Sequence, residues 1–295
     1  MINEIRFAQL IKLVSQLYTD DMVGEIQNRP TDLNAYDNTI INTTPEMIGM
    51  HGQALHEIHI FLAPVWMKQS DIDQSIIDKY ESVIRLFNSM VTRADSDVEI
   101  KEMKPPVLSL NFKGVGYVTV LQSSLYILSN DKKNVINTCH QVAEMFKEAG
   151  FVVIREKIEA TIFGTKGIPQ TSAEMISFQK YFEYHIRVQR KNTEDHNPLT
   201  IDEIQILEEI SQEFETEFHT PVPLSYNRSK IGTDGGYQRY LNVRFRDFGS
   251  GDAYDRVKQI VDRISTTTVF KVIKVISEYV WYDTFTALDK GWLDF

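Results

Sequence analysis

The chain carries an internal repeat, and this repeat is the feature that most limits the folds it can adopt. Four short segments occur twice in the same order, separated by 126, 116, 123 and 119 residues. The matched segments are 57–60 with 183–186, 108–111 with 224–227, 117–120 with 240–243, and 151–155 with 270–274. Four matches in the same order indicate two homologous halves joined by a linker.

Composition limits the class of protein. At 295 residues and 42% hydrophobic content, the chain is long enough for two cores of ordinary domain size. The formal net charge of −10 argues against broad electrostatic binding to nucleic acid or to an anionic membrane. The single cysteine, Cys139, excludes an internal disulfide and a thiolate metal cluster, which fits a reducing compartment.

No apolar run approaches the ~18 residues that a membrane-spanning helix needs. Residues 1–6 also lack the basic start and apolar core of a secretion signal. We therefore expect a cytoplasmic protein without a membrane partner.

Apolar periodicity predicts the same order of elements in both halves, strand–helix–strand–strand–helix–strand. The predicted elements are 56–63, 70–92, 107–112, 116–128, 133–149 and 151–162 in the first half, and 181–190, 200–218, 222–228, 237–247, 251–265 and 270–282 in the second. This order is the ferredoxin-like plan, in which helices cover one face of an antiparallel sheet and leave the other face open. The predicted fold class is therefore α+β, with two tandem ferredoxin-like lobes.

The domain organisation follows from these elements. A helix over residues 3–18 and a polar connector make up an N-terminal extension, residues 1–50. Lobe one is predicted over 51–162, a linker over 163–180 and lobe two over 181–295. Lobe two ends in an aromatic tail that we expect to dock across the lobes or to engage a protein partner; its residues are Trp281, Tyr282, Phe285, Trp292 and Phe295.

Polar residues recur on one face of the predicted strands in both halves. Because side chains alternate along a strand, Glu57 and His59 share the open face of lobe one, and Glu183 and His185 share that of lobe two. Other polar residues expected there are Ser109, Asn111, Tyr117, Arg155, Lys157, Arg187, Ser225, Asn227, Tyr240, Arg244 and Lys274. A solvated face, or a sheet–sheet interface with satisfied polar pairs, would retain the same residues and stays open as an alternative.

The strand order expected for this plan makes the first and third strands neighbours. His59 is then expected near Tyr117 and Thr119, and His185 near Tyr240 and Asn242. If the two open faces meet across a pseudo-twofold axis, both histidines line one cleft ringed by cations, which would suit a phosphate-bearing ligand.

This arrangement predicts an enzyme acting on a phosphate ester, most plausibly a nucleotide or RNA end. His59 and His185 would be the acid–base pair, oriented by Glu57 and Glu183. Phosphate would be neutralised or positioned by Arg155, Lys157, Arg187, Arg244, Ser109, Asn111, Ser225 and Asn227, while Tyr117 and Tyr240 could stack on a base.

The two-lobe plan with one histidine from each lobe resembles the two-histidine phosphoesterases, which open cyclic phosphates and 2′–5′ linkages. That resemblance implies a His-x-Ser/Thr motif on each lobe, with one imidazole as base, the other as acid and the hydroxyls holding phosphate. The corresponding triplets here begin at His59 and His185 and end in Phe61 and Arg187, so the hydroxyl is absent both times. Membership of that family is therefore not claimed.

Two other hypotheses stay open. One is a non-catalytic module that binds a nucleotide, a short RNA or a protein in its cleft or through its aromatic tail. The other is a two-Glu, two-His site in which Glu57, His59, Glu183 and His185 bind Zn, Mn or Fe. The sequence does not identify a cofactor.

Overall fold

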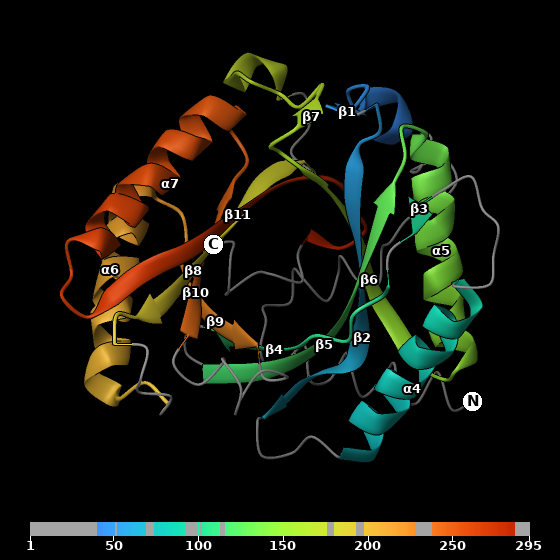
Figure 1. Ribbon diagram of the computed structural model, residues 1–295, viewed down its shortest axis with the longest axis horizontal. Coiled ribbons are helices and arrows are strands. Elements are labelled where there is room, and N and C mark those ends of the chain that lie inside the picture. Colours follow the sequence, from blue (N-terminus) through green and yellow to red (C-terminus); the bar gives the residue numbers. More distant parts are fainter. Residues whose placement is uncertain are drawn as a thin grey trace, which may run out of the picture.

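The computed structural model of the chain describes residues 40–50, 52–68, 74–91, 99–100, 102–112, 116–175, 180–192, 198–227 and 238–286 (Figure 1). The first half contains β2 (Leu55–Lys68), α4 (Gln74–Val91), β4 (Val107–Phe112), β5 (Gly116–Leu128), α5 (Lys132–Glu148) and β6 (Val152–Thr161). The second half contains β8 (Tyr181–Arg190), α6 (Ile201–Phe218), β9 (Leu224–Asn227), β10 (Gln238–Phe245), α7 (Ser250–Ser265) and β11 (Phe270–Asp283). These are the predicted elements, and their order is confirmed.

Short additional elements lie outside this repeated order. They are β1 (Ile48–Gly49), β3 (Glu99–Ile100), β7 (Thr165–Lys166) and the 3₁₀ helix η1 (Ser172–Glu174). The predicted helix over 3–18, and Trp292 and Phe295 of the tail, lie outside the described residues.

The main strands form one closed antiparallel barrel. The hydrogen-bonded order is β2-β6-β11-β8-β10-β9-β4-β5, and β5 pairs with β2 to complete the ring of eight strands. Two pairings join the halves, β6 with β11 and β4 with β9. The short β3 pairs with the end of β5 outside the ring.

The prediction of two tandem ferredoxin-like lobes is wrong. The edge strands of each half are not free, because β6 pairs with β11 and β4 pairs with β9 across the halves. The sheet faces that were expected to be open therefore become the inner wall of the barrel. Unpaired strand edges are unfavourable, and closing the sheet satisfies their backbone groups.

The helices lie outside the barrel on two opposite sides. Figure 1 shows α4 and α5 beside the first half and α6 and α7 beside the second half. Outward-facing aliphatic side chains of the strands pack under them; Ile58 and Ile60 of β2 and Ile186 and Val188 of β8 are fully buried. The apolar core thus lies between barrel and helices, while the barrel interior carries charged and polar side chains together with some apolar ones. None of the helices in the described parts of the chain has both the length and the apolar character needed to cross a bilayer.

A buried ion pair holds the seam between β6 and β11. Arg155 donates from Nε and Nη2 to the two carboxylate oxygens of Asp283, at 2.8 and 2.5 Å. The Tyr181 hydroxyl donates to the same carboxylate at 2.7 Å. Arg155 is only 1% exposed. If Asp283 were removed, water could therefore not replace the carboxylate as a partner of the guanidinium. Nearby, Trp281 of the aromatic tail contacts His56 of β2, with 3.3 Å between Nε1 and Nδ1.

The first prediction concerns this seam. Asp283→Asn leaves the Arg155 guanidinium buried without its counter-charge, so we expect the free energy of unfolding to fall by about 3–5 kcal/mol. The double variant Arg155→Met/Asp283→Leu is expected to lose less than the two single changes added together. Urea unfolding measures both effects, with Asp262→Asn in the exposed Lys258–Asp262 pair as the control. Additive losses in the double variant would contradict the prediction.

The second prediction concerns the start of α6. Thr200 and Glu203 form a capping box, and Glu203 also binds Arg190 through both oxygens at 2.6 Å. The hydrogen bond from Arg190 lowers the pKa of Glu203 to about 2, so its stabilisation is present above the ordinary carboxyl range and is lost as pH falls toward 2.

We therefore expect Glu203→Gln to lower the free energy of unfolding by about 2 kcal/mol at pH 7. The difference from the wild type should shrink progressively below about pH 4.5. Thermal melts of both proteins between pH 3 and 7 measure it, and Glu208→Gln on the exposed side of the same helix is the control. A gap that is independent of pH would show that the ion pair is not its cause.

Candidate functional site

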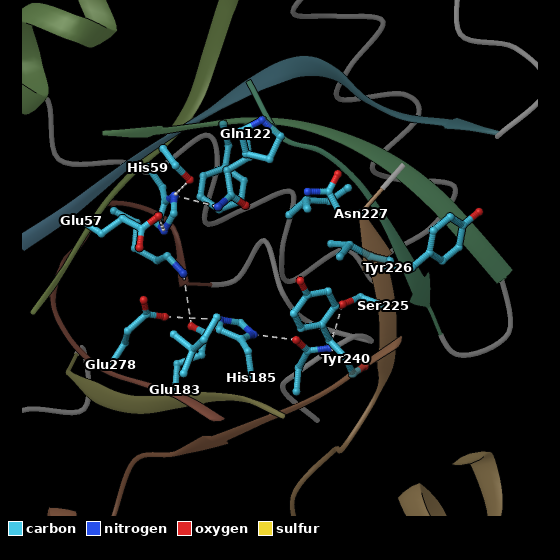
Figure 2. A pocket seen from close by; sticks show the side chains of 18 of the residues that line it. Glu57, His59, Gln122, Glu183, His185, Ser225, Tyr226, Asn227, Tyr240 and Glu278 are labelled. Atoms are coloured by element: carbon cyan, nitrogen blue, oxygen red, sulfur yellow. Dashed lines mark hydrogen bonds and ion pairs between the residues drawn. The ribbon is translucent and has the colours of Figure 1, made fainter. Parts of the chain in front are cut away.

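A pocket of about 210 Å³ opens into the barrel interior and takes side chains from both halves. Figure 2 shows Glu57 and His59 on one side of it and Glu183, His185 and Glu278 on another. Of the residues proposed from the sequence, those that line this pocket are Glu57, His59, Arg155, Lys157, Glu183, His185, Ser225, Asn227 and Tyr240.

Strand register brings the acidic groups and histidines together. On β2 and β6, Glu57 lies opposite Glu159 and His59 lies opposite Lys157. On β8 and β11, Glu183 lies opposite Glu278 and His185 lies opposite Ile276. Because residues two apart point to the same face, each half aims one histidine and two glutamates into the barrel.

In the first half the histidine is held between two carboxylates. His59 Nε2 lies 2.8 Å from Glu159 Oε2 and 3.6 Å from Glu57 Oε1. Its other ring nitrogen, Nδ1, lies 3.2 Å from the backbone oxygen of Ser123 and 2.7 Å from the side-chain amide of Gln122. The ring is therefore fixed from both sides, with Nε2 turned toward the glutamates.

The second half repeats this arrangement. His185 Nε2 lies 3.6 Å from Glu183 Oε1 and 3.5 Å from Glu278 Oε2. Its Nδ1 donates to Asn242 Oδ1 at 2.6 Å, and the Asn242 amide in turn donates to Ser225 Oγ at 3.0 Å. His185 keeps 23% of its side chain exposed because it borders the pocket.

The described interior holds more carboxylates than permanent cations. Lys157 links the halves, with its Nζ 2.5 Å from Glu159 Oε1 and 3.2 Å from Glu183 Oε2. Arg244 also donates to Glu183 Oε2, at 3.3 Å. Glu159 and Glu183 thus contact permanent cations, whereas Glu57 and Glu278 face the histidines.

This excess of negative charge shifts the pKa values of the site. Burial alone would lower the pKa of His59, but Glu159 and Glu57 together raise it. Burial is likewise outweighed at His185, whose pKa rises to about 9 through Glu278 and Glu183. Burial and the charge of Glu159 raise the pKa of Glu278 to about 8. The interior therefore draws in protons at neutral pH.

Two carboxylates stay ionised because cations touch them. Burial would raise the pKa of Glu183, yet Lys157 and Arg244 lower it to about 2. Lys157 and His59 lower the pKa of Glu159 in the same way, and the pKa of Lys157 itself is raised by Glu159 and Glu183 against the effect of burial.

Several residues proposed from the sequence lie elsewhere. Ser109 is fully buried away from the pocket, and Leu108 and Leu110 line the pocket in its place, so β4 presents the face opposite to the one expected. Lys274 is exposed. Arg187 donates to Gln238 at 2.9 Å. The side chains of Asn111 and Tyr117 lie outside the described residues.

The expected position of His59 beside Tyr117 and Thr119 is wrong. The register places His59 opposite Ser124, while Thr119 pairs with Met67 beyond an irregularity in β2. In the second half His185 lies opposite Asn242, as expected. Ser124 and Asn242 are therefore equivalent, with an offset of 118 residues, and the match of 117–120 with 240–243 misaligned the third strands.

Alternation along the last strand of each half also places Glu159 and Glu278 on the same face as the histidines, although neither was assigned a role in the site. Sequence reasoning left out Gln122, Ser124 and Tyr126, because their place depends on the register of β5 against β2, which the sequence does not reveal.

Comparisons with known proteins provide little guidance. No family model matches the sequence, and no curated protein is similar to it. A haem-binding protein from Thermus thermophilus has a TM-score of 0.26 at 7% identity, over 80% of this chain and 94% of that one. An aldoxime dehydratase in complex with butyraldoxime reaches 0.36 at 11% identity, over 81% and 87%. A mutant chlorite dismutase from Candidatus Nitrospira defluvii, in complex with cyanide, has 0.26 at 9% identity, over 80% and 94%. With TM-scores this low, these likenesses support no inference about function.

The prediction of a phosphate-ester, nucleotide or RNA-end processing enzyme is wrong. It required free cations around the histidines, whereas Arg155 is paired with Asp283 and Lys157 with Glu159 and Glu183. The histidines themselves face carboxylates, which would repel a phosphate. The prediction that Glu57, His59, Glu183 and His185 form one metal site is also wrong. The two histidines do not share one set of glutamates, because each contacts the two glutamates of its own half.

The third prediction concerns the protonation of the histidines in metal-free protein. His185 should carry protons on both ring nitrogens at pH 7.5 and lose one only near pH 9. His56, on the outer face of β2, has its pKa lowered by burial to about 4 and should stay neutral at pH 7.5. Nitrogen-15 NMR titration, assigned with single His→Gln variants, tests both. A His185 that titrates near the ordinary value of about 6.5 would contradict this account of the interior charge.

Proposed function

We propose that this protein binds a divalent transition-metal ion inside the barrel, through Glu57, His59 and Glu159, and presents it to a small ligand in the pocket. The observation that carries the proposal is that these three buried residues each offer one ligand atom, and that the three atoms lie within 4.8 Å of one another.

The separations suit shared coordination. Ligands bound at about 2.1 Å to one ion lie about 3.0–3.4 Å apart at octahedral or tetrahedral angles. The distances of 2.8 and 3.6 Å from His59 Nε2 to the carboxylates of Glu159 and Glu57 bracket this range, so small shifts admit an ion. One imidazole and two carboxylates suit Mn²⁺, Fe²⁺ or Zn²⁺.

The surroundings of His59 hold its ring in place. Nδ1 lies 3.2 Å from the backbone oxygen of Ser123, which accepts a hydrogen bond, and 2.7 Å from the side-chain nitrogen of Gln122, which donates one, so these contacts orient the ring without fixing one tautomer. Nε2 is the ring nitrogen that faces the carboxylates, and a neutral imidazole can bind a metal ion through it.

The charge balance supports a cation as well. Glu159 and Glu57 raise the pKa of His59 against the effect of burial, so this position favours positive charge. A divalent ion would be attracted by the same carboxylates.

The pocket limits what the ion could act on. Three protein ligands leave coordination positions for water or substrate, and a bound ion there supplies Lewis-acid or redox chemistry. A cavity of about 210 Å³ is smaller than the roughly 300–1,000 Å³ of pockets for drug-sized ligands, so the substrate is a small molecule. Phe61, Leu108 and Leu110 add apolar surface to the lining of the pocket.

The fourth prediction tests the proposal by equilibrium dialysis of chelator-treated full-length protein against Mn²⁺ and, separately, Zn²⁺. His59→Gln is expected to bind one ion fewer per chain than the wild type, because it removes the ligand between the two carboxylates. His140→Gln is the matched control: its Nδ1 lies 2.6 Å from Glu156 Oε2, a similar His–Glu pair on the outer face of the barrel wall.

Wild-type protein that binds neither ion, or His59→Gln protein that binds as many ions as the wild type, would contradict the proposal.

Haemin is a further probe, because one of the solved structures is described as haem-binding. A haemin absorption shift that depends on His59, without any binding of Mn²⁺ or Zn²⁺, would replace the proposal with a different cofactor.

A further inference from the structure

We infer that the second half carries a second metal position, formed by Glu183, His185 and Glu278, so that the barrel holds a pair of divalent ions. This inference rests on the proposed function of the first site and extends it to a two-metal centre. It is carried by the equivalent strand positions of the two ligand sets, and by the contacts of His185 with both glutamates of its own half.

The two ligand sets occupy equivalent positions in the barrel. In each half a Glu-x-His pair lies on the strand that begins the half, β2 or β8, and the third glutamate lies on the strand that ends it, β6 or β11. In both cases the third glutamate is directly opposite the first one in the register. Packing alone does not require both halves to retain an acid–acid cross-strand pair, since like charges opposite each other are destabilising.

The second set is more open than the first, because its three ligand atoms do not all lie within 4.8 Å of one another, so its carboxylates must move inward to share an ion. His185 Nε2 lies 3.6 and 3.5 Å from the nearest oxygens of Glu183 and Glu278, slightly wider than the first set. All three residues line the pocket, so an ion bound there would be accessible from it.

The ring orientation is also repeated. The oxygen of Asn242 accepts a hydrogen bond from His185 Nδ1, because the amide nitrogen of Asn242 is used in donating to Ser225 and to the Pro223 backbone oxygen. This fixes the tautomer that leaves Nε2 as the ligand atom. Asn242 is thus a positioning residue for His185.

Lys157 separates the two positions without occupying either one. It contacts Glu159 through Oε1 and Glu183 through Oε2, whereas the oxygens nearest the histidines are Glu159 Oε2 and Glu183 Oε1. Each of these carboxylates can therefore bind an ion through one oxygen while it holds the ammonium through the other. Because the two glutamates share one ammonium, the ions would lie close together.

The test is the number of Mn²⁺ ions bound per chain by chelator-treated full-length protein, measured by equilibrium dialysis. The wild type is expected to bind two, and His185→Gln and Glu278→Gln one each. Asn242→Leu should weaken the second ion by about 10–100-fold and leave the first unchanged. Electron paramagnetic resonance provides an independent reading: two neighbouring Mn²⁺ ions broaden each other's signal, and the single ion of His185→Gln should give the sharper lines of isolated Mn²⁺.

The outcomes separate this inference from the proposed function. Wild-type protein that binds one ion, lost in His59→Gln but retained in His185→Gln, would overturn the second position and leave the first standing. Wild-type protein that binds no ion would overturn both. Glu278→Gln guards against misfolding of the histidine variant, because the pKa of Glu278 is already raised and the amide resembles the protonated acid in shape.

Discussion

The interior of this barrel depends on the balance of buried charge. Four glutamates are turned inward by the alternation of side chains, and a buried carboxylate without a partner costs several kcal/mol. Lys157 pairs with one glutamate from each half, Glu159 and Glu183. Arg244 provides a second cation for Glu183. The histidines complete the balance by taking up protons, so each polar group in this part of the interior is placed by the needs of its neighbours.

The same constraint explains how the closed sheet and the site are related. Closure through β6–β11 and β4–β9 satisfies the strand edges, and it also removes the inner faces from bulk water. A glutamate that would need no partner on an open sheet becomes strongly dependent on its neighbours inside a barrel. The apolar contacts that stabilise the chain lie on the other side of the strands, beneath the helices, which leaves the interior free to hold groups selected for chemistry.

The repeat and the apolar periodicity were sufficient to predict the described strands and helices, because both depend on local sequence. They also identified Glu57, His59, Glu183 and His185, since alternation and recurrence mark these residues together. Closure was not predictable, because β4 and β9 pair through only a few residues far apart in sequence, with no pattern that distinguishes an edge from a paired strand. The neighbours of His59 were missed for a related reason: the register of β5 against β2, which places Ser124 opposite His59, is not visible in the sequence.

The two halves are not identical around the site: the position opposite the histidine carries Lys157 in the first half and Ile276 in the second, and Ser124 of the first half corresponds to Asn242 of the second. A cavity with perfect twofold symmetry would offer a small unsymmetrical molecule two equivalent ways to bind, turned end for end. These differences remove that equivalence, so a duplicated cavity gains a preferred orientation for its guest.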